Sequence, residues 1–104
     1  MILAIDFDDT YTRDPDLWDK FLRAALERGH RVYCVSARHE RQMGEVRDTV
    51  GRVIGAGACF GTSGAPKRSY MAEVVDTYVD VWIDDAPESI PDLADPDPYP
   101  VPDL

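Results

Sequence analysis

Three short apolar runs, at residues 2–5, 32–35 and 81–83, each end at a polar or acidic side chain. A short run that is apolar throughout is typical of a strand covered on both faces within a parallel sheet. These runs therefore predict three strands of one buried sheet, each of which stops where its polar residue begins.

Amphipathic stretches separate these runs. The first has Asp14 as a predicted N-cap, Pro15 at the first helical position and Gly29 at its end. Its apolar residues follow helical spacing: Leu17, Trp18, Phe21, Leu22, Ala25 and Leu26. A second helix, ending near Gly51, carries Met43, Val46 and Val50. A third, with Pro66 in its first turn, carries Tyr70, Met71, Val74, Val75 and Tyr78.

The stretch 52–64 contains four glycines and two short apolar runs, at 53–54 and 58–60. Either run is compatible with a third strand, because glycine-rich segments mark turns on both sides of them. We favour 58–60. Strands that alternate with amphipathic helices then predict an α/β fold, with right-handed crossovers and a parallel sheet.

We expect about four strands in the order third, second, first, fourth, in a three-layer Rossmann-like arrangement with helices on both faces. Residues 1–90 would form this domain. The segment 91–104 holds five prolines and four aspartates, which exclude a helix and predict an extended tail. In such sheets, ligands bind beyond the carboxyl ends of the strands.

The net charge of the chain limits which classes of partner it can bind. Twenty acidic against eleven basic residues among 104 give a net charge of -9, which repels nucleic acid and anionic membranes and attracts cations. No apolar run approaches the roughly 18 residues of a membrane span. We expect a cytoplasmic protein without a membrane partner; nothing in the sequence specifies an oligomeric state.

The carboxyl ends of the first, second and fourth predicted strands deliver five polar side chains to one edge of the sheet: Asp6, Asp8, Ser36, Asp84 and Asp85. Carboxylates crowded at low dielectric repel one another, so they need a cation or shifted pKa values. A hard cation that prefers oxygen ligands, such as Mg²⁺, fits this set best.

The motifs 6–10 (DFDDT), Ser36 after an apolar strand, Lys67, and the pair Asp84-Asp85 after another apolar strand resemble motifs I to IV of the haloacid dehalogenase (HAD) superfamily. They occur in the family's order and span residues 2–85. The resemblance implies a HAD-like fold and a magnesium-dependent phosphatase, a phosphoric monoester hydrolase.

The resemblance also implies roles for individual residues. Asp6 would be the nucleophile, and Asp8 the general acid and base, with its backbone carbonyl as a metal ligand. Metal ligands would be Asp6, Asp84 and, through water, Asp85. The phosphate would be bound by Thr10, Ser36 and Lys67, and Lys67 would also be catalytic because it neutralises charge on the phosphate and on Asp6. Arg38 either contacts a substrate anion or belongs to a solvated helix face.

Two departures from the family's pattern shape the expected substrate. Asp9 stands where many members have Gly, and the 29 residues between Asp6 and Ser36 leave no room for a cap domain. The chain is thus similar to small cap-less members, among them phage-encoded proteins and polynucleotide phosphatase domains. The partner would be a small phosphorylated substrate such as a nucleotide, the phosphate at a nucleic-acid end, or another phosphometabolite.

Alternative interpretations remain at this point. Ser36 could be a helix N-cap, and Asp85 with Glu88 has the spacing of a capping box. A receiver-type signalling domain uses similar residue types, but its phosphorylated Asp follows the third strand, where this chain has none. A non-catalytic HAD-like module that binds metal or protein through its acidic edge is the stronger rival.

Overall fold

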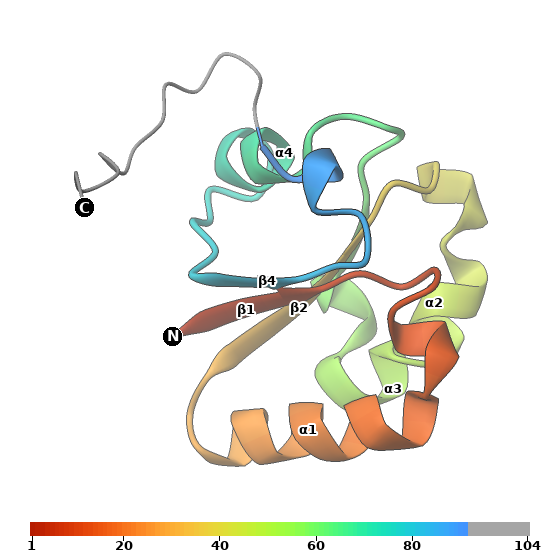
Figure 1. Ribbon diagram of the computed structural model, residues 1–104, viewed down its shortest axis with the longest axis vertical. Coiled ribbons are helices and arrows are strands. Elements are labelled where there is room, and N and C mark those ends of the chain that lie inside the picture. Colours follow the sequence, from red (N-terminus) through yellow and green to blue (C-terminus); the bar gives the residue numbers. More distant parts are fainter. Residues whose placement is uncertain (92–104) are drawn as a thin grey trace, which may run out of the picture.

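The computed structural model describes residues 1–91, which form a four-stranded, all-parallel sheet with helices on both faces (Figure 1). Its strands are β1 (Ile2–Ile5), β2 (Arg31–Ser36), β3 (Cys59–Gly61) and β4 (Val81–Ile83). Their order is β3-β2-β1-β4, so the predicted order is confirmed. β1 lies at the centre, where Leu3 is opposite Val32 on one side and Val81 on the other.

Helix α1 (Pro15–Glu27) connects β1 to β2 and begins and ends as its sequence predicts. A carboxylate oxygen of Asp14 accepts a hydrogen bond from the backbone N–H of Leu17, 3.2 Å away, which satisfies one of the free donors of the first turn. Gly29, just beyond the helix, has φ +87°, a conformation that glycine adopts at little cost.

The predicted second helix is divided in two. Helix α2 (Gly44–Asp48) and helix α3 (Gly51–Ile54) follow one another, preceded by the 3-10 turn η2 (Glu40–Gln42). Gly51 therefore begins a helix, and the prediction that it ends one is wrong. A Cβ atom at this glycine would make ordinary van der Waals contacts with Arg47, Ala56 and Cys59, so the position is closely packed. The run 53–54 is helical, which leaves 59–61 as the third strand, one residue later than predicted.

Helix α4 (Lys67–Glu73) is shorter than predicted. Pro66 is its N-cap residue, one position before the helix, and the chain leaves the helix at Val74. Tyr78 consequently lies outside the helix with an exposed side chain. The other short turns are η1 (Tyr11–Arg13), η3 (Ala56–Ala58) and η4 (Pro87–Ser89).

Two apolar clusters cover the two faces of the sheet. α1, α2 and α3 lie on one side and α4 on the other (Figure 1). Leu3 and Ile5 of β1 belong to the cluster under α1, whereas Ala4 packs with Met71 of α4. This alternation along β1 is the period of two expected of a strand buried on both faces.

The connections leave no interval for a cap domain within residues 1–91. α1 fills most of the chain between β1 and β2, and the short elements η2, α2, α3 and η3 together fill most of that between β2 and β3. None of the helices in this range has the length and apolar character needed to cross a bilayer. Apart from Pro91, the predicted extended tail lies outside the described residues.

Candidate functional site

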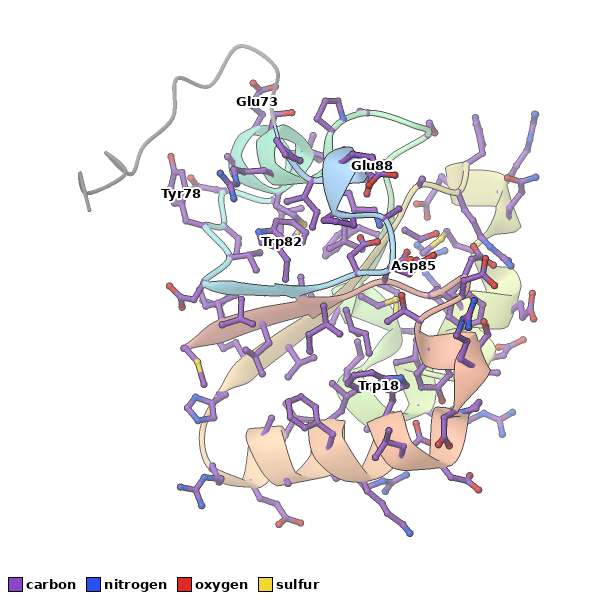
Figure 2. The ribbon with its side chains drawn as sticks, in the orientation of Figure 1. Trp18, Glu73, Tyr78, Trp82, Asp85 and Glu88 are labelled. Carbon is purple, nitrogen blue, oxygen red and sulfur yellow. The ribbon has the colours of Figure 1, made fainter. Side chains whose placement is uncertain are left out.

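The carboxyl ends of the strands bring four of the predicted side chains to one edge of the sheet. Asp6 follows β1 directly, and its backbone N–H donates to the carbonyl of Ile83, at 2.9 Å, which extends the β1–β4 ladder. Asp84 and Asp85 follow β4, and Figure 2 shows Asp85 at that end of the strand. Ser36 ends β2.

Lys67 joins two of these carboxylates inside the protein. Its ammonium nitrogen lies 3.0 Å from a carboxylate oxygen of Asp6 and 2.5 Å from one of Asp84. The side chains of Lys67 and Asp84 are 3% and 2% exposed, and Asp6 is 8% exposed. A lysine in the first turn of α4 opposes the helix dipole, so these two ion pairs, and not the helix, account for its position.

Thr10 links the buried group to Asp85. Its hydroxyl lies 3.1 Å from an Asp85 carboxylate oxygen and 3.4 Å from one of Asp6, and it accepts from the backbone N–H of Asp85. This hydrogen bonding, and the absence of a side-chain cap at η4 within the described residues, show that the capping-box interpretation of Asp85 is wrong.

The carboxylates of Asp6, Asp84 and Asp85 offer oxygen atoms that all lie within 4.8 Å of one another. Three carboxylates beside one ammonium group leave negative charge at a largely buried edge, which a divalent cation would neutralise. All the donors are hard oxygens, which suit Mg²⁺ better than a thiophilic metal. The residues therefore fit the predicted Mg²⁺, with these three side chains as its holders.

The environment shifts the pKa values of two acids in this group in opposite directions. Burial raises the pKa of Asp6 to about 6, although the neighbouring Lys67 acts to lower it. Hydrogen bonding to Asp6 and to Thr10 lowers the pKa of the exposed Asp85. In the metal-free protein, Asp6 consequently holds a proton up to a higher pH than an ordinary aspartate does.

The carboxylate of Asp8 lies outside this group. Arg38 binds both its oxygens, at 2.9 and 2.8 Å, in a bidentate ion pair that lowers the pKa of Asp8. Arg38 also donates to the carbonyl of Gln42 and to Glu45, and its guanidinium lies over the ring of Phe7. Arg38 is therefore already engaged by the protein's own groups, and an anion reaches it only by competing with Asp8.

The turn after β1 explains the acidic residue at position 9. Asp9 has φ +59°, a left-handed conformation that glycine adopts freely and that Asp tolerates better than most residues. Its backbone N–H donates to the hydroxyl of Thr12, 3.0 Å away. The Asp9 side chain is exposed, so an aspartate is accommodated at this position without crowding the turn.

Ser36 is buried, and its hydroxyl oxygen accepts a hydrogen bond from the backbone N–H of Arg38, at 3.1 Å. It closes the turn after β2 and is not a helix N-cap, since the next element, η2, is capped by His39. Gly61 packs against this turn: a Cβ atom at Gly61 would lie 2.6 Å from the carbonyl oxygen of Arg38.

Sequence reasoning missed two features of this edge. Thr62 is buried next to Ser36, whose carbonyl accepts from the Thr62 backbone N–H, at 2.8 Å, and the Thr62 hydroxyl has no hydrogen-bond partner within residues 1–91. A cleft of about 390 Å³ also adjoins the carboxylates. Its walls come from the turn after β1, the start of α1 and the end of β4: Asp9, Thr10, Arg13, Asp14, Leu17, Trp18, Ile83, Asp84 and Asp85.

Comparison of the chain with protein-family models, with curated proteins and with solved structures finds no match.

Proposed function

We propose that the protein is a magnesium-dependent phosphohydrolase that cleaves a phosphate monoester through an aspartyl-phosphate on Asp6. The observation that carries the proposal is the buried carboxylate of Asp6, held by Lys67 at the strand edge that also bears Asp84 and Asp85. A nucleophilic carboxylate, a fixed cation and a hard metal site are the groups that phosphoryl transfer requires.

In this proposal, a carboxylate oxygen of Asp6 attacks phosphorus while the bond to the leaving alcohol breaks. Lys67 neutralises charge that develops on the phosphoryl oxygens, and Thr10 and Ser36 lie at the same edge to donate hydrogen bonds. Mg²⁺ held by the three carboxylates would supply further neutralisation. Water then hydrolyses the acyl phosphate, which regenerates Asp6 and releases inorganic phosphate.

In this proposal Asp8 is the general acid and base. Its ion pair with Arg38 must open before it can act. Both of its oxygens accept from Arg38, so Asp8 must lose this pair and take up a proton from water before it can give a proton to the leaving oxygen. An anionic substrate competes with Asp8 for the guanidinium, which would release the acid when substrate binds. Arg38 then takes the phosphate-binding role proposed for it only in the substrate complex.

The same ion pair favours a second candidate, a non-catalytic module of the same fold that binds metal or a protein partner through its acidic edge. In that case the Arg38–Asp8 pair would be permanent and would only stabilise the turn. The four motifs in HAD order, with the observed joining of Lys67 to Asp6 and Asp84, support a cap-less HAD phosphatase over this alternative.

Hydrolysis of 4-nitrophenyl phosphate in Mg²⁺ tests the proposal. We expect turnover that a chelator abolishes and that excess Mg²⁺ restores. Asp6→Asn is the matched control, because it preserves shape while removing the nucleophile. A wild-type protein that is folded yet inert with Mg²⁺ and Mn²⁺ between pH 5 and 8 would establish the non-catalytic module instead.

A further inference from the structure

The cleft beside the carboxylates is continuous with the proposed phosphate site. Thr10, Asp84 and Asp85 belong both to the acidic edge and to the cleft wall. A phosphate ester bound at Asp6 therefore has the cleft as a neighbouring space for its alcohol. No cap domain lies within residues 1–91, so this open cleft offers a contact surface for that part of the substrate.

Leu17, Trp18 and Ile83 form the apolar part of the wall. Leu17 is 55% exposed although it lies on the apolar stripe of α1, whereas Trp18 packs partly against the core. Figure 2 shows Trp18 on the side of α1 that faces the sheet. These side chains offer a contact surface for an apolar group of about the size of a single ring.

The polar side chains of the wall differ in whether they are already engaged. Asp14 caps α1, Asp84 binds Lys67 and the backbone N–H of Ala86, and Asp85 binds Thr10. The guanidinium of Arg13 has no ion pair or side-chain hydrogen bond within residues 1–91. A guanidinium stacks favourably on aromatic faces, which an aliphatic group of the same size does not offer.

We propose that the cleft binds an aromatic ring on the alcohol of the phosphate ester, in contact with Leu17, Trp18 and the guanidinium of Arg13. This inference rests on the proposed phosphohydrolase activity, whose substrate class it defines. The ring can belong to a small aryl alcohol or to a nucleobase, since both present the same apolar faces. Specificity would then reside in the start of α1 and in η1.

Binding of non-hydrolysable phosphonates tests the inference without turnover. Benzylphosphonate, cyclohexylmethylphosphonate and ethylphosphonate share the phosphonate group and differ only in the apolar part. By calorimetry in Mg²⁺, we expect benzylphosphonate to bind at least about tenfold more tightly than ethylphosphonate, with the cyclohexyl compound between them. The non-hydrolysable methylenephosphonate analogue of AMP, measured against that of ribose 5-phosphate, tests the nucleobase as the source of the ring.

Tryptophan emission locates the bound ring. Trp82 lies on the other face of the sheet, in the α4 cluster, and its buried indole N–H has no partner among the described residues. Trp82→Phe therefore leaves Trp18 as the sole tryptophan of the chain at little structural cost. Saturating benzylphosphonate, but not ethylphosphonate, should change the Trp18 emission of this variant.

Three variants on exposed positions complete the test. Arg13→Gln should remove the preference for benzyl over cyclohexylmethyl, and Leu17→Ser should weaken both ligands. Leu26→Ser on the same helix, outside the cleft, should weaken neither. If neither a benzyl group nor a nucleobase raises affinity, or if Arg13→Gln and Leu17→Ser bind as the wild type does, the inference is overturned.

Failure of the inference is separable from failure of the proposed function. Hydrolysis of 4-nitrophenyl phosphate without any preference for an aromatic phosphonate overturns the cleft assignment alone. Ring-dependent binding that Arg13→Gln removes, in a protein without phosphatase turnover, supports the cleft as an aromatic phosphate site and overturns only catalysis.

Discussion

Asp6 and Asp8 lie two residues apart, yet they occupy contrasting regions of the molecule. Asp6 is buried and is held by the buried Lys67, whereas the side chain of Asp8 is 51% exposed and is held by the partly exposed Arg38. Burial raises the pKa of Asp6, and the bidentate hydrogen bonding from Arg38 lowers that of Asp8. Both residues are aspartates, so burial and the hydrogen-bonding partner determine the pKa of each carboxylate.

The inner ion pair, Asp6 with Lys67, and the outer ion pair, Asp8 with Arg38, therefore have different roles. The inner pair stays together because an unpaired charge in the interior costs several kcal/mol. The outer pair is screened by solvent and is exchanged at little cost, so a substrate anion can open it. In the proposed mechanism, the rigid carboxylate is the nucleophile and the releasable one is the acid and base.

The largest expected effect comes from removing the inner carboxylate. Asp6→Asn should reduce hydrolysis of 4-nitrophenyl phosphate to the rate of the buffer, because an amide does not attack phosphorus. Mass spectrometry should find no covalent phosphate on this variant. Retained activity in Asp6→Asn would show that the nucleophile lies elsewhere.

Removing the outer carboxylate should slow turnover about 100- to 10,000-fold, the usual worth of one proton-transfer role. An aryl leaving group needs little acid assistance, so the first step of Asp8→Asn should proceed and phosphate should accumulate on Asp6. The signature is a burst of nitrophenol followed by slow release. Asp9→Asn serves as the control, since this neighbour is exposed and Asn tolerates its backbone conformation; the comparison fails if Asp9→Asn loses as much activity.

The two cations should differ in their effect on stability. Lys67→Met leaves two buried carboxylates without their cation and should lower the free energy of unfolding by about 3–5 kcal/mol. Arg38→Met breaks a partly exposed pair and should lower it by at most about 1 kcal/mol. Urea unfolding in metal-free buffer measures both, and equal losses would contradict the division into inner and outer pairs.

The pKa of Asp6 predicts a pH dependence that Asp8 does not share. Because it is about 6 in the folded protein and 3.8 ordinarily, the folded state binds the proton more tightly, and the resulting stabilisation is complete below about pH 3.8 and lost as the pH rises through 6. In metal-free buffer, the stability of wild type relative to Asp6→Asn should fall between pH 4 and 7, by up to about 3 kcal/mol. If the difference in stability between wild type and Asp6→Asn does not change with pH, the pKa of Asp6 is not raised.

Stabilisation by Mg²⁺ should depend on the acidic cluster and not on Asp8, and we expect this effect to be smaller than those above. At ten times its dissociation constant, Mg²⁺ should stabilise the native protein by about 1.4 kcal/mol, a rise of several degrees in Tm. Asp84→Asn should remove most of this gain, whereas Asp8→Asn should keep most of it because that carboxylate lies outside the cluster. Calorimetric scans with and without Mg²⁺ provide the measurement, and a full gain in Asp84→Asn would place the cation elsewhere.

The sequence predicted the sheet more closely than the helices. β1 and β4 have the predicted bounds because an uninterrupted apolar run ends where the chain reaches the polar edge. The break between α2 and α3 escaped prediction because Met43, Val46 and Val50 are all buried, as one continuous helix would also require. The break lies at Thr49, whose φ of -114° and ψ of -90° depart from the helical conformation.

Topology likewise predicted the meeting of Asp6 with Asp84, since parallel strands end at a common edge. It did not predict that Arg38 binds Asp8, because this depends on how a turn aims a long side chain. The cleft was missed for a related reason. Leu17 and Trp18 fit the apolar stripe of α1, and helical spacing alone does not distinguish a buried stripe from one that partly faces open space.

Gly61 has a consequence for how this chain can diverge. A methyl group at this position would overlap the backbone of Arg38 and not its side chain, so the constraint is independent of which residue occupies position 38. Any relative with another residue in place of the arginine should therefore still carry glycine at the end of β3. Among such proteins we expect the glycine to change more slowly during evolution than the charged residues around it.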